Sequence, residues 1–504
     1  MKLPIDHKAI LDNEISKIIS TQEMGKLYLS KEKVGDSIAN IVNLFYFNPW
    51  SLQQTVFKNL EFSKIDDLIK INSIIRSNAA IQNLIKKQSP GRKYWNTILP
   101  FADKVENVLS NEYSPPQRIA LFPGLSCMFF CGFCGRNQKA KYPSSIVDQS
   151  VKNMKKILEE KSPSTKISIS GGLEPLTNTK INDILGDGLI DNIKIPLITN
   201  AYNLTKNFIE KNINLMKLDS IRVSLYGWDE QSYFNITRNK KSFQMVKQNL
   251  TELIKKRNEI NKNLKIGLNF IILRENMNYL TDVIDFIKTI NENVLNGKGI
   301  DFLSLRDDYH SVTGNSDKYD TDRIYRTEGR IENEERQKLM FLIQNLNDYK
   351  KKYCASLHID YGYSLEFLSQ GFYSVGLNKI KSNNLNTKGF TQLSVAVDTY
   401  GDVFMFREAG FLNREGNKKM IIGRVDDKTN LENVIKNFLS DEKVKTFQEN
   451  DLRFLDSFDH VLASMVFQKE QDIKFGISLN QNPIKSENYK VESGTGNNWY
   501  SDDI

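Results

Sequence analysis

The sequence predicts an α/β protein, in which a partial (β/α)6 barrel follows a helical N-terminal region and precedes a smaller C-terminal α+β region. Six short apolar runs alternate with longer amphipathic stretches from residue 118 onward, and such repeats imply parallel strands joined by right-handed crossovers. Before that point, apolar residues recur at helical spacing. No strand is followed by a dinucleotide-binding glycine fingerprint, which favours an open barrel over a doubly wound nucleotide-binding sheet.

Residues 1–115 form the predicted helical N-terminal region. Its clearest segments with helical periodicity are Ala9–Ile19, Val34–Tyr46 and Phe62–Ser77. The region shows neither strand alternation nor a chemical motif, so we expect it to be a packing or lid domain.

Residues 116–320 form the predicted barrel. Its expected strands are Arg118–Phe122, Lys166–Ser170, Ile195–Thr199, Ile221–Leu225, Ile266–Ile272 and Ile300–Arg306. The expected helices between them include Ile146–Glu160, Phe243–Arg257 and Tyr279–Ile290.

The rest of the chain is predicted in three parts. The polar stretch His310–Asn333 resembles a long loop or insertion. Residues 321–476 are expected to be an α+β region with a helix at Glu335–Tyr353 and a hairpin of Leu393–Val397 with Val403–Arg407. Residues 477–504 become rich in Asn, Ser and Gly with little apolar content, so we expect a disordered tail.

Composition excludes several classes of protein. No run of eighteen apolar residues occurs, and the N-terminus lacks the apolar core of a signal peptide, so neither a membrane protein nor an exported one is expected. The net charge of +8 arises from 69 basic and 61 acidic residues mixed along the chain. This weak excess suits an anionic small molecule better than a nucleic acid.

Three of the four cysteines lie within eight residues, at Cys127, Cys131 and Cys134. So few cysteines exclude a disulfide framework and indicate a reducing cytoplasm. Three thiolates on a short loop after the first barrel strand can bind three irons of a cubane cluster and leave the fourth iron open. The alternatives are a structural zinc site, which would need a fourth ligand such as Cys354, or three buried thiols.

The spacing C-x3-C-x2-C, with Phe133 before the last cysteine, resembles the signature of the radical S-adenosylmethionine (SAM) superfamily. The sequence Ser170-Gly-Gly-Leu-Glu-Pro175 after the second strand resembles the glycine-rich element of that family. The resemblance implies a [4Fe–4S] cluster on the three cysteines and SAM as the second cofactor. It implies that SAM contacts Phe133, Gly171, Gly172, Glu174, Asn200 and Ser224. For Asn200 and Ser224, a strand-end cap and an ordinary strand hydroxyl remain the alternatives.

In this family, SAM cleavage yields a 5′-deoxyadenosyl radical that takes a hydrogen atom from the substrate. Longer stretches such as Tyr94–Pro100, Leu357–Tyr363 and Gly401–Phe411 resemble a branch of ammonia-lyases acting on amino-dideoxy sugar nucleotides. That resemblance implies radical deamination of a TDP-4-amino-4,6-dideoxyglucose-like substrate to a 3-keto sugar. The single cysteine outside the triplet leaves too few thiolates for an auxiliary cluster, which also favours a redox-neutral reaction.

Candidate substrate residues follow from position. Arg306, Asp307 and Tyr309 leave the sixth strand at the barrel mouth, where an arginine can bind a diphosphate and the others can bind sugar groups. Arg407 and Glu408 end the C-terminal hairpin as a charged pair. Strand-end caps, surface charges and a local salt bridge are the alternatives. The sequence does not identify the general base.

Two other functions remain open from the sequence. A radical SAM dehydrogenase or epimerase of a related sugar or cyclitol would use the same cofactors, and a non-enzymatic scaffold could bind a structural metal at the triplet. The resemblance implies a flavodoxin or ferredoxin as electron donor, and we expect no nucleic-acid or membrane partner.

Overall fold

A computed structural model describes residues 1–21, 29–110, 112–131, 134, 139–186, 188–191, 193–294, 297–307, 335–373, 380–441 and 447–485. Within these residues a single ten-stranded sheet has the order β10-β9-β8-β1-β2-β3-β4-β5-β6-β7. Its strands are β1 (Arg118–Leu121), β2 (Lys166–Ile169), β3 (Pro196–Thr199), β4 (Ser220–Leu225), β5 (Lys265–Ile272), β6 (Phe302–Asp307), β7 (His358–Tyr361), β8 (Ser394–Val397), β9 (Asp402–Phe404) and β10 (Ile421–Arg424).

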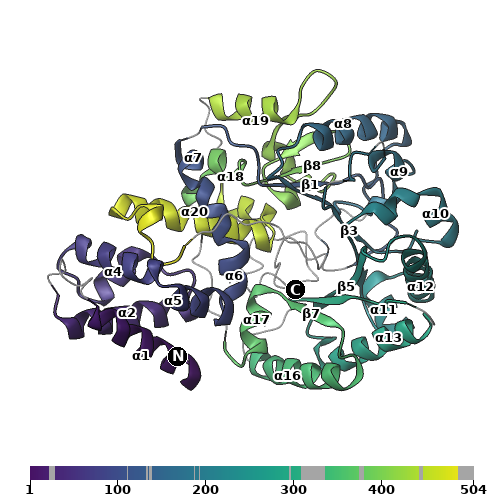
Figure 1. The fold of residues 1–504 in the computed structure, drawn as a ribbon. Coiled ribbons are helices and arrows are strands. Elements are labelled where there is room, and N and C mark those ends of the chain that lie inside the picture. The colour runs from purple at the N-terminus through teal and green to yellow at the C-terminus, as the bar shows by residue number, and fades with distance from the viewer. Residues whose placement is uncertain are drawn as a thin grey trace.

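Strands β1 to β6 are parallel and neighbour one another in chain order, as the repeating strand–helix pattern predicts. Helices cover the outside of this curved sheet (Figure 1). They are α8 (Val147–Glu160), α9 (Ile181–Ile184), α10 (Lys206–Lys211), α11 (Glu230–Thr237), α12 (Ser242–Ile260), α13 (Leu280–Glu292) and α16 (Arg336–Tyr353). The partial (β/α)6 barrel is therefore confirmed.

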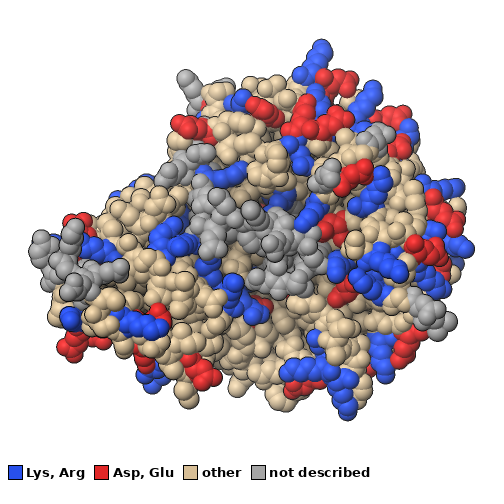
Figure 2. Space-filling model, in the orientation of Figure 1, with Lys and Arg blue, Asp and Glu red and all other residues tan. Residues whose placement is uncertain are grey.

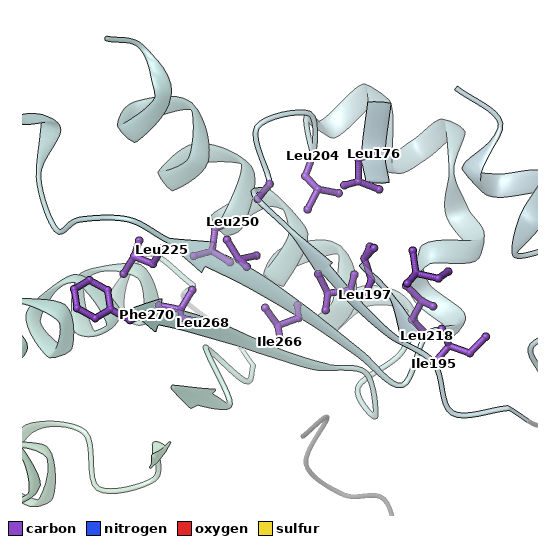
Figure 3. Packing of buried hydrophobic residues seen from close by; sticks show 14 of the residues in the cluster. Leu176, Ile195, Leu197, Leu204, Leu218, Leu225, Leu250, Ile266, Leu268 and Phe270 are labelled. Carbon is purple, nitrogen blue, oxygen red and sulfur yellow. The ribbon is translucent and has the colours of Figure 1, made fainter. Parts of the chain in front are cut away.

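The two faces of the barrel sheet differ in chemistry. Leu197, Leu225 and Leu268 belong to the apolar core between strands and helices, together with Leu250 of α12 (Figure 3). Because successive strand residues point to opposite faces, Arg222 lies on the inner side of β4, with its guanidinium 5.5 Å from the centre of the Phe302 ring. The inner side of the barrel thus holds buried polar groups.

The N-terminal region is helical throughout its described part, as predicted. Its α-helices are α1 (Ile5–Ser20), α2 (Lys31–Phe47), α3 (Gln53–Asn59), α4 (Ile65–Ser77), α5 (Ala79–Asn83), α6 (Arg92–Thr97) and α7 (Val105–Ser110). These helices share a second hydrophobic core with the C-terminal region. For example, the Phe101 and Phe458 rings meet edge to face at 5.8 Å. The N-terminal region is therefore packed on the C-terminal residues and has no separate core of its own.

The strands of the C-terminal α+β region extend the barrel sheet. Strand β8 pairs in parallel with β1, and β7 pairs in parallel with β6. The predicted hairpin of β8 and β9 is present, but β9 ends at Phe404, so Arg407 begins a short 3-10 helix rather than ending the strand. The helices of this region are α17 (Tyr363–Ser369), α18 (Thr387–Phe390), α19 (Leu431–Ser440) and α20 (Ser457–Phe475).

Residues 477–485, which fall in the stretch expected to be disordered, are ordered. Ile484 is buried, and the Gln82 side chain donates to the Pro483 carbonyl at 2.7 Å and accepts from the Lys485 amide at 3.0 Å. The low apolar content of this stretch was misleading, because two isoleucines suffice to anchor it on the N-terminal helices. Residues 486–504 and the proposed insertion at 310–333 lie outside the described residues.

Two surface properties bear on partners. In the described part of the chain, every helix is too short or too polar to cross a membrane. Basic and acidic side chains are interspersed over the face shown in Figure 2, as the mixed charge of the sequence suggests. This face presents no broad field of one sign of charge.

Candidate functional site

The cysteine-bearing loop follows β1 at the carboxyl end of the barrel. Cys131 is buried, and Cys127 and Cys134 pack partly buried against the same barrel core. The loop is anchored in its middle, where the Phe130 amide donates to the Thr237 carbonyl at 2.9 Å. The three cysteines therefore lie at the mouth, as expected from their place after the first strand.

Aromatic rings surround the buried side of this loop. The ring of Phe129, only 1% exposed, meets the rings of Tyr202, Tyr226 and Tyr233 edge to face at 5.7, 5.8 and 6.2 Å. Burial raises the pKa of Tyr226 well above its usual range, and the nearby Cys131 and Cys127 raise it further. The tyrosine therefore remains neutral beside two of the cysteines.

The glycine-rich loop after β2 is joined directly to the cysteine loop. The Glu174 amide donates to the Ser126 carbonyl at 2.9 Å, and the Thr177 hydroxyl accepts from the amides of Leu125 and Ser126 at 2.9 and 3.1 Å. A side chain at Gly124 would place its Cβ 2.7 Å from the Glu174 carbonyl oxygen. The close approach of the two loops thus requires glycine at position 124.

Glu174 is buried, and its carboxylate accepts three hydrogen bonds that link its own loop to the end of β3. It accepts from the Thr199 hydroxyl, from the Asn200 amide at 2.8 Å and from the Leu176 amide at 3.2 Å. Burial raises the pKa of Glu174 to about 7, against the lowering effect of these hydrogen bonds. Glu174 therefore orients the end of β3 relative to the glycine-rich loop.

Asn200 and Ser224 lie next to the same loops. The Asn200 amide group donates to the Met128 sulfur at 3.2 Å and points to the Cys127 sulfur at 3.8 Å. Ser224 is nearly buried, and its carbonyl accepts from the Tyr233 hydroxyl at 3.4 Å. Gly172 approaches the backbone of Gly410, where a Cβ would meet the carbonyl oxygen at 3.0 Å. The structure thus gathers these predicted cofactor residues near the cysteine loop, apart from Phe133, which lies outside the described residues.

The turn between β8 and β9 supports both ends of the cysteine loop. The Thr399 hydroxyl donates to the carbonyls of Phe122 and Gly124 at 2.9 and 3.2 Å. At the other end, the Tyr142 amide donates to the Leu125 carbonyl at 2.8 Å, and the Tyr142 hydroxyl donates to Asp398 at 2.9 Å. Sequence analysis gave these C-terminal residues no role, since their partners are more than 250 positions away.

The buried carboxyl group of Asp398 should make the stability of the fold depend on pH. Burial raises the pKa of Asp398 from 3.8 to about 7, so between these values the folded chain keeps a proton that the unfolded chain loses. Its contribution to stability is therefore lost as pH rises through about 7. In Asp398→Asn, the free energy of unfolding should therefore fall less steeply between pH 5 and pH 8, by up to about 1.4 kcal/mol per pH unit. Urea titrations at a series of pH values measure this slope.

The exposed carboxylate of Asp191, which pairs with Lys217 at 3.0 Å, provides the control. Asp191→Asn should leave the slope of the wild-type profile unchanged. A slope in Asp398→Asn equal to that of the wild type would show that Asp398 does not titrate as argued.

The candidate substrate residues fall into two ionic clusters. Arg306, whose side chain is 18% exposed, pairs with Asp360 of β7. Arg407 pairs with Asp456 at 3.3 Å and donates to the Ser170 hydroxyl at 2.8 Å, directly before the glycine-rich loop. Both guanidinium groups thus lie close to strand ends on the polar side of the sheet.

Glu408 pairs with Arg414 at 2.7 Å and is nearly buried, which supports the salt-bridge alternative for this residue. The side chain of Asp307 and the whole of Tyr309 lie outside the described part of the structure. Lys93 and Asp360 were missed by sequence reasoning: Lys93 of α6 pairs with Asp360 and donates to the Tyr361 carbonyl. For Asp360, the only sequence signal of a functional role is the short polar run 358–363. For Lys93, the neighbouring sequence gives no such signal.

A cavity of about 300 Å³ opens beside Tyr226, between α11 and the segment after β5. Trp228 and Tyr279 line it, with their rings stacked at 4.5 Å. The amide and carboxylate groups in its wall include Gln231, Asn235 and Glu275. This cavity adds a mixed aromatic and polar wall at the carboxyl ends of β4 and β5.

The donor set of the cysteine loop fits an iron–sulfur cluster. All three cysteines are free thiols on one loop, and thiolates are the ligands of such clusters. Among the described residues, these three cysteines included, no three His, Cys, Asp or Glu side chains form the compact group that binds one metal ion, so the fit rests on the thiolate chemistry and on the place of the loop.

Comparisons with known proteins agree with this chemistry. The family model of the Radical SAM superfamily matches residues 121–287. The dTDP-4-amino-4,6-dideoxy-D-glucose ammonia-lyase of Streptomyces venezuelae is 31% identical over 393 residues, which cover 77% of this chain and 78% of that enzyme. Among solved structures, SuiB of Streptococcus suis aligns at 15% identity over 76% of this chain and 75% of its own, with a TM-score of 0.43. The structure of anSMEcpe with bound AdoMet aligns at 13% identity over 77% and 90%, with a TM-score of 0.41.

The likeness to the ammonia-lyase covers 77% of this chain and 78% of that enzyme. The chain therefore belongs to the radical SAM superfamily, whose enzymes use a [4Fe–4S] cluster and S-adenosylmethionine.

Proposed function

We propose that this enzyme is an ammonia-lyase that deaminates a TDP-linked 4-amino-4,6-dideoxy sugar. The identity of 31% to an enzyme of that name, over 77% of this chain, supports the proposal most strongly. The reaction is redox-neutral: the C3 hydroxyl becomes a ketone, C4 becomes a methylene group, and the amine leaves as ammonia. It therefore needs no auxiliary cluster as an electron acceptor.

In this proposal Cys127, Cys131 and Cys134 ligate the cluster through their thiolates. The donor set and the placement of the loop at the barrel mouth support this assignment. Cluster and SAM, when bound, supply the 5′-deoxyadenosyl radical that removes the C3 hydrogen. Phe129 and the tyrosines around it exclude water from the place where this reactive species forms.

SAM would bind against the two joined loops. We assign Gly171 and Gly172 to the close backbone approach and Glu174, Asn200 and Ser224 to polar contacts with the cofactor. The short links among Glu174, Asn200 and the cysteine loop support this assignment. In the same proposal Glu174 also fixes the loop geometry, because its carboxylate is already shared by three donors.

The anionic end of the sugar nucleotide would bind to arginine. Arg306 and Arg407 both present partly exposed guanidinium groups near strand ends, each oriented by an acidic partner. A guanidinium can contact two phosphate oxygens at once and is held rigidly by such a pair.

A product assay tests this function. The assay mixes reduced, cluster-loaded protein with SAM, TDP-4-amino-4,6-dideoxyglucose and flavodoxin or ferredoxin in a reducing buffer. The enzyme should release ammonia and 5′-deoxyadenosine in equal amounts. A keto sugar that retains its nitrogen would instead identify a dehydrogenase, and a recovered stereoisomer would identify an epimerase. Either product would contradict the lyase assignment while leaving the radical chemistry intact.

A further inference from the structure

Helix α6 places one lysine of the N-terminal region against the inner side of the barrel. The Lys93 side chain is only 5% exposed, pairs with the Oδ1 atom of Asp360 and donates to the Tyr361 carbonyl. The same helix is fastened nearby, because the Thr97 hydroxyl lies 3.0 Å from the Tyr363 hydroxyl. Its position beside β7, an edge strand of the sheet, is therefore fixed from two sides.

The two carboxylate oxygens of Asp360 have different partners. The Lys93 ammonium donates to Oδ1. The Oδ2 atom accepts from Arg306 and, at 3.2 Å, from the Ser304 hydroxyl. The main-chain carbonyl of Asp360 also accepts from Arg306, at 3.1 Å. Arg306 contacts the Oδ2 atom and the main-chain carbonyl of Asp360, while Lys93 donates to Oδ1, so this pair is not the two-oxygen fork that a guanidinium and a carboxylate often form.

We propose that Lys93 is a positioning residue for substrate. Its bond to Oδ1 fixes the orientation of the Asp360 carboxylate, and this carboxylate in turn orients the Arg306 guanidinium toward the diphosphate of the sugar nucleotide. This inference rests on the proposed function, in which Arg306 binds the anionic end of the substrate. It gives the helical region a part in substrate recognition beyond the packing or lid role that its sequence suggests.

Electrostatics agree with the arrangement. Burial alone raises the pKa of Asp360, but the charges of Arg306 and Lys93 outweigh it and hold that pKa well below its usual range. Burial lowers the pKa of Lys93 to about 8, against the opposing effect of Asp360. Near neutral pH the lysine is therefore charged and keeps the carboxylate ionised.

Without Lys93, the buried Oδ1 atom would lack its charged donor. The lowest-energy response is for Asp360 to turn both oxygens to Arg306, since bidentate pairing satisfies them at once. The guanidinium would then be drawn toward β7 and away from the diphosphate. The loss should appear in substrate affinity, because the cluster and SAM loops lie on other strands.

The test compares Lys93→Met, Lys93→Arg and the control Lys104→Met. Lys104 belongs to the same helical region, also has a pKa lowered to about 8 by burial, and donates to the Pro115 carbonyl at 2.5 Å. Calorimetry with TDP as the probe and kinetics with the TDP-amino sugar supply the readouts. Lys93→Met should raise the Kd for TDP and KM by roughly tenfold or more, as expected when one partner of a buried charge pair is removed.

In the same variant, SAM affinity and kcat should stay within about threefold of wild type. The lost contact would weaken binding of the substrate and of the transition state equally, and would leave the chemical step unchanged. Lys93→Arg should restore TDP binding, and Lys104→Met should match the wild type. Wild-type TDP affinity in folded Lys93→Met protein, or an equal loss in Lys104→Met, would overturn the proposal.

If Lys93→Met fails to fold, Asp360→Asn takes its place, because it retains the volume and removes the charge that orients Arg306. Its TDP affinity should fall as in Lys93→Met, and wild-type affinity would overturn the proposal. The proposed function fails separately: a wild-type enzyme that binds SAM but neither binds TDP nor deaminates the sugar would reject the substrate assignment itself.

Discussion

Serine at Cys127, Cys131 or Cys134, introduced one position at a time, is expected to abolish the cluster and reduce SAM cleavage to the level seen without enzyme. Each proposed ligand is a thiolate for which a serine hydroxyl is a poor substitute. The visible absorption band of the cluster, the iron content per chain and 5′-deoxyadenosine formation give three independent measurements.

Cys354 supplies the matched control. It caps the end of α16 and is partly buried, so Cys354→Ser should retain full iron content and turnover. Undiminished iron and deoxyadenosine after substitution of all three loop cysteines would disprove the assignment of the cluster ligands. Loss of iron in Cys354→Ser alone would instead place a ligand at the end of that helix.

Gly124→Ala is expected to have the next largest effect. The added methyl group would lie 2.7 Å from the backbone of Glu174 and Leu173, which cannot give way as a flexible side chain can. The cysteine loop and the glycine-rich loop would move apart. Because a displacement of about 1 Å can cost roughly 100-fold in rate, turnover should fall by about that factor, and stability by about 1–3 kcal/mol as in other overpacked sites.

Gly91→Ala is a suitable comparison, since its added methyl group would meet nothing closer than 3.4 Å. Kinetics under saturating SAM, with thermal unfolding of both variants, would separate the local effect from a general one. If Gly124→Ala turns over at the rate of Gly91→Ala, the junction of the two loops is not needed for catalysis.

The barrel could be predicted because its information is local. Strands such as β4 and β5 are short apolar runs between amphipathic helices, and their observed bounds lie within one residue of the predicted ones. The cysteine spacing is likewise contained in eight residues. Periodicity and spacing along the chain therefore suffice for the scaffold and for the proposed cluster ligands.

The support of the site could not be predicted because it depends on contacts between distant residues. Lys93 meets Asp360 across 267 positions, and Tyr142 meets Asp398 across 256. Nothing in the neighbourhood of Lys93 distinguishes it from the other lysines of its region. For the same reason the sequence did not reveal that the C-terminal strands β8 and β7 pair with β1 and β6.

The pairing of β1 with β8 has a consequence for biosynthesis. Arg118 and Phe122 donate their amides to Leu393 and Val397 at 3.0 and 2.9 Å, so the strand that leads into the cysteines is completed by residues synthesised almost 280 positions later. A nascent chain on the ribosome lacks this neighbour until residue 397 has been translated. Iron and sulfide should therefore be inserted only after β8 has been synthesised and has paired with β1.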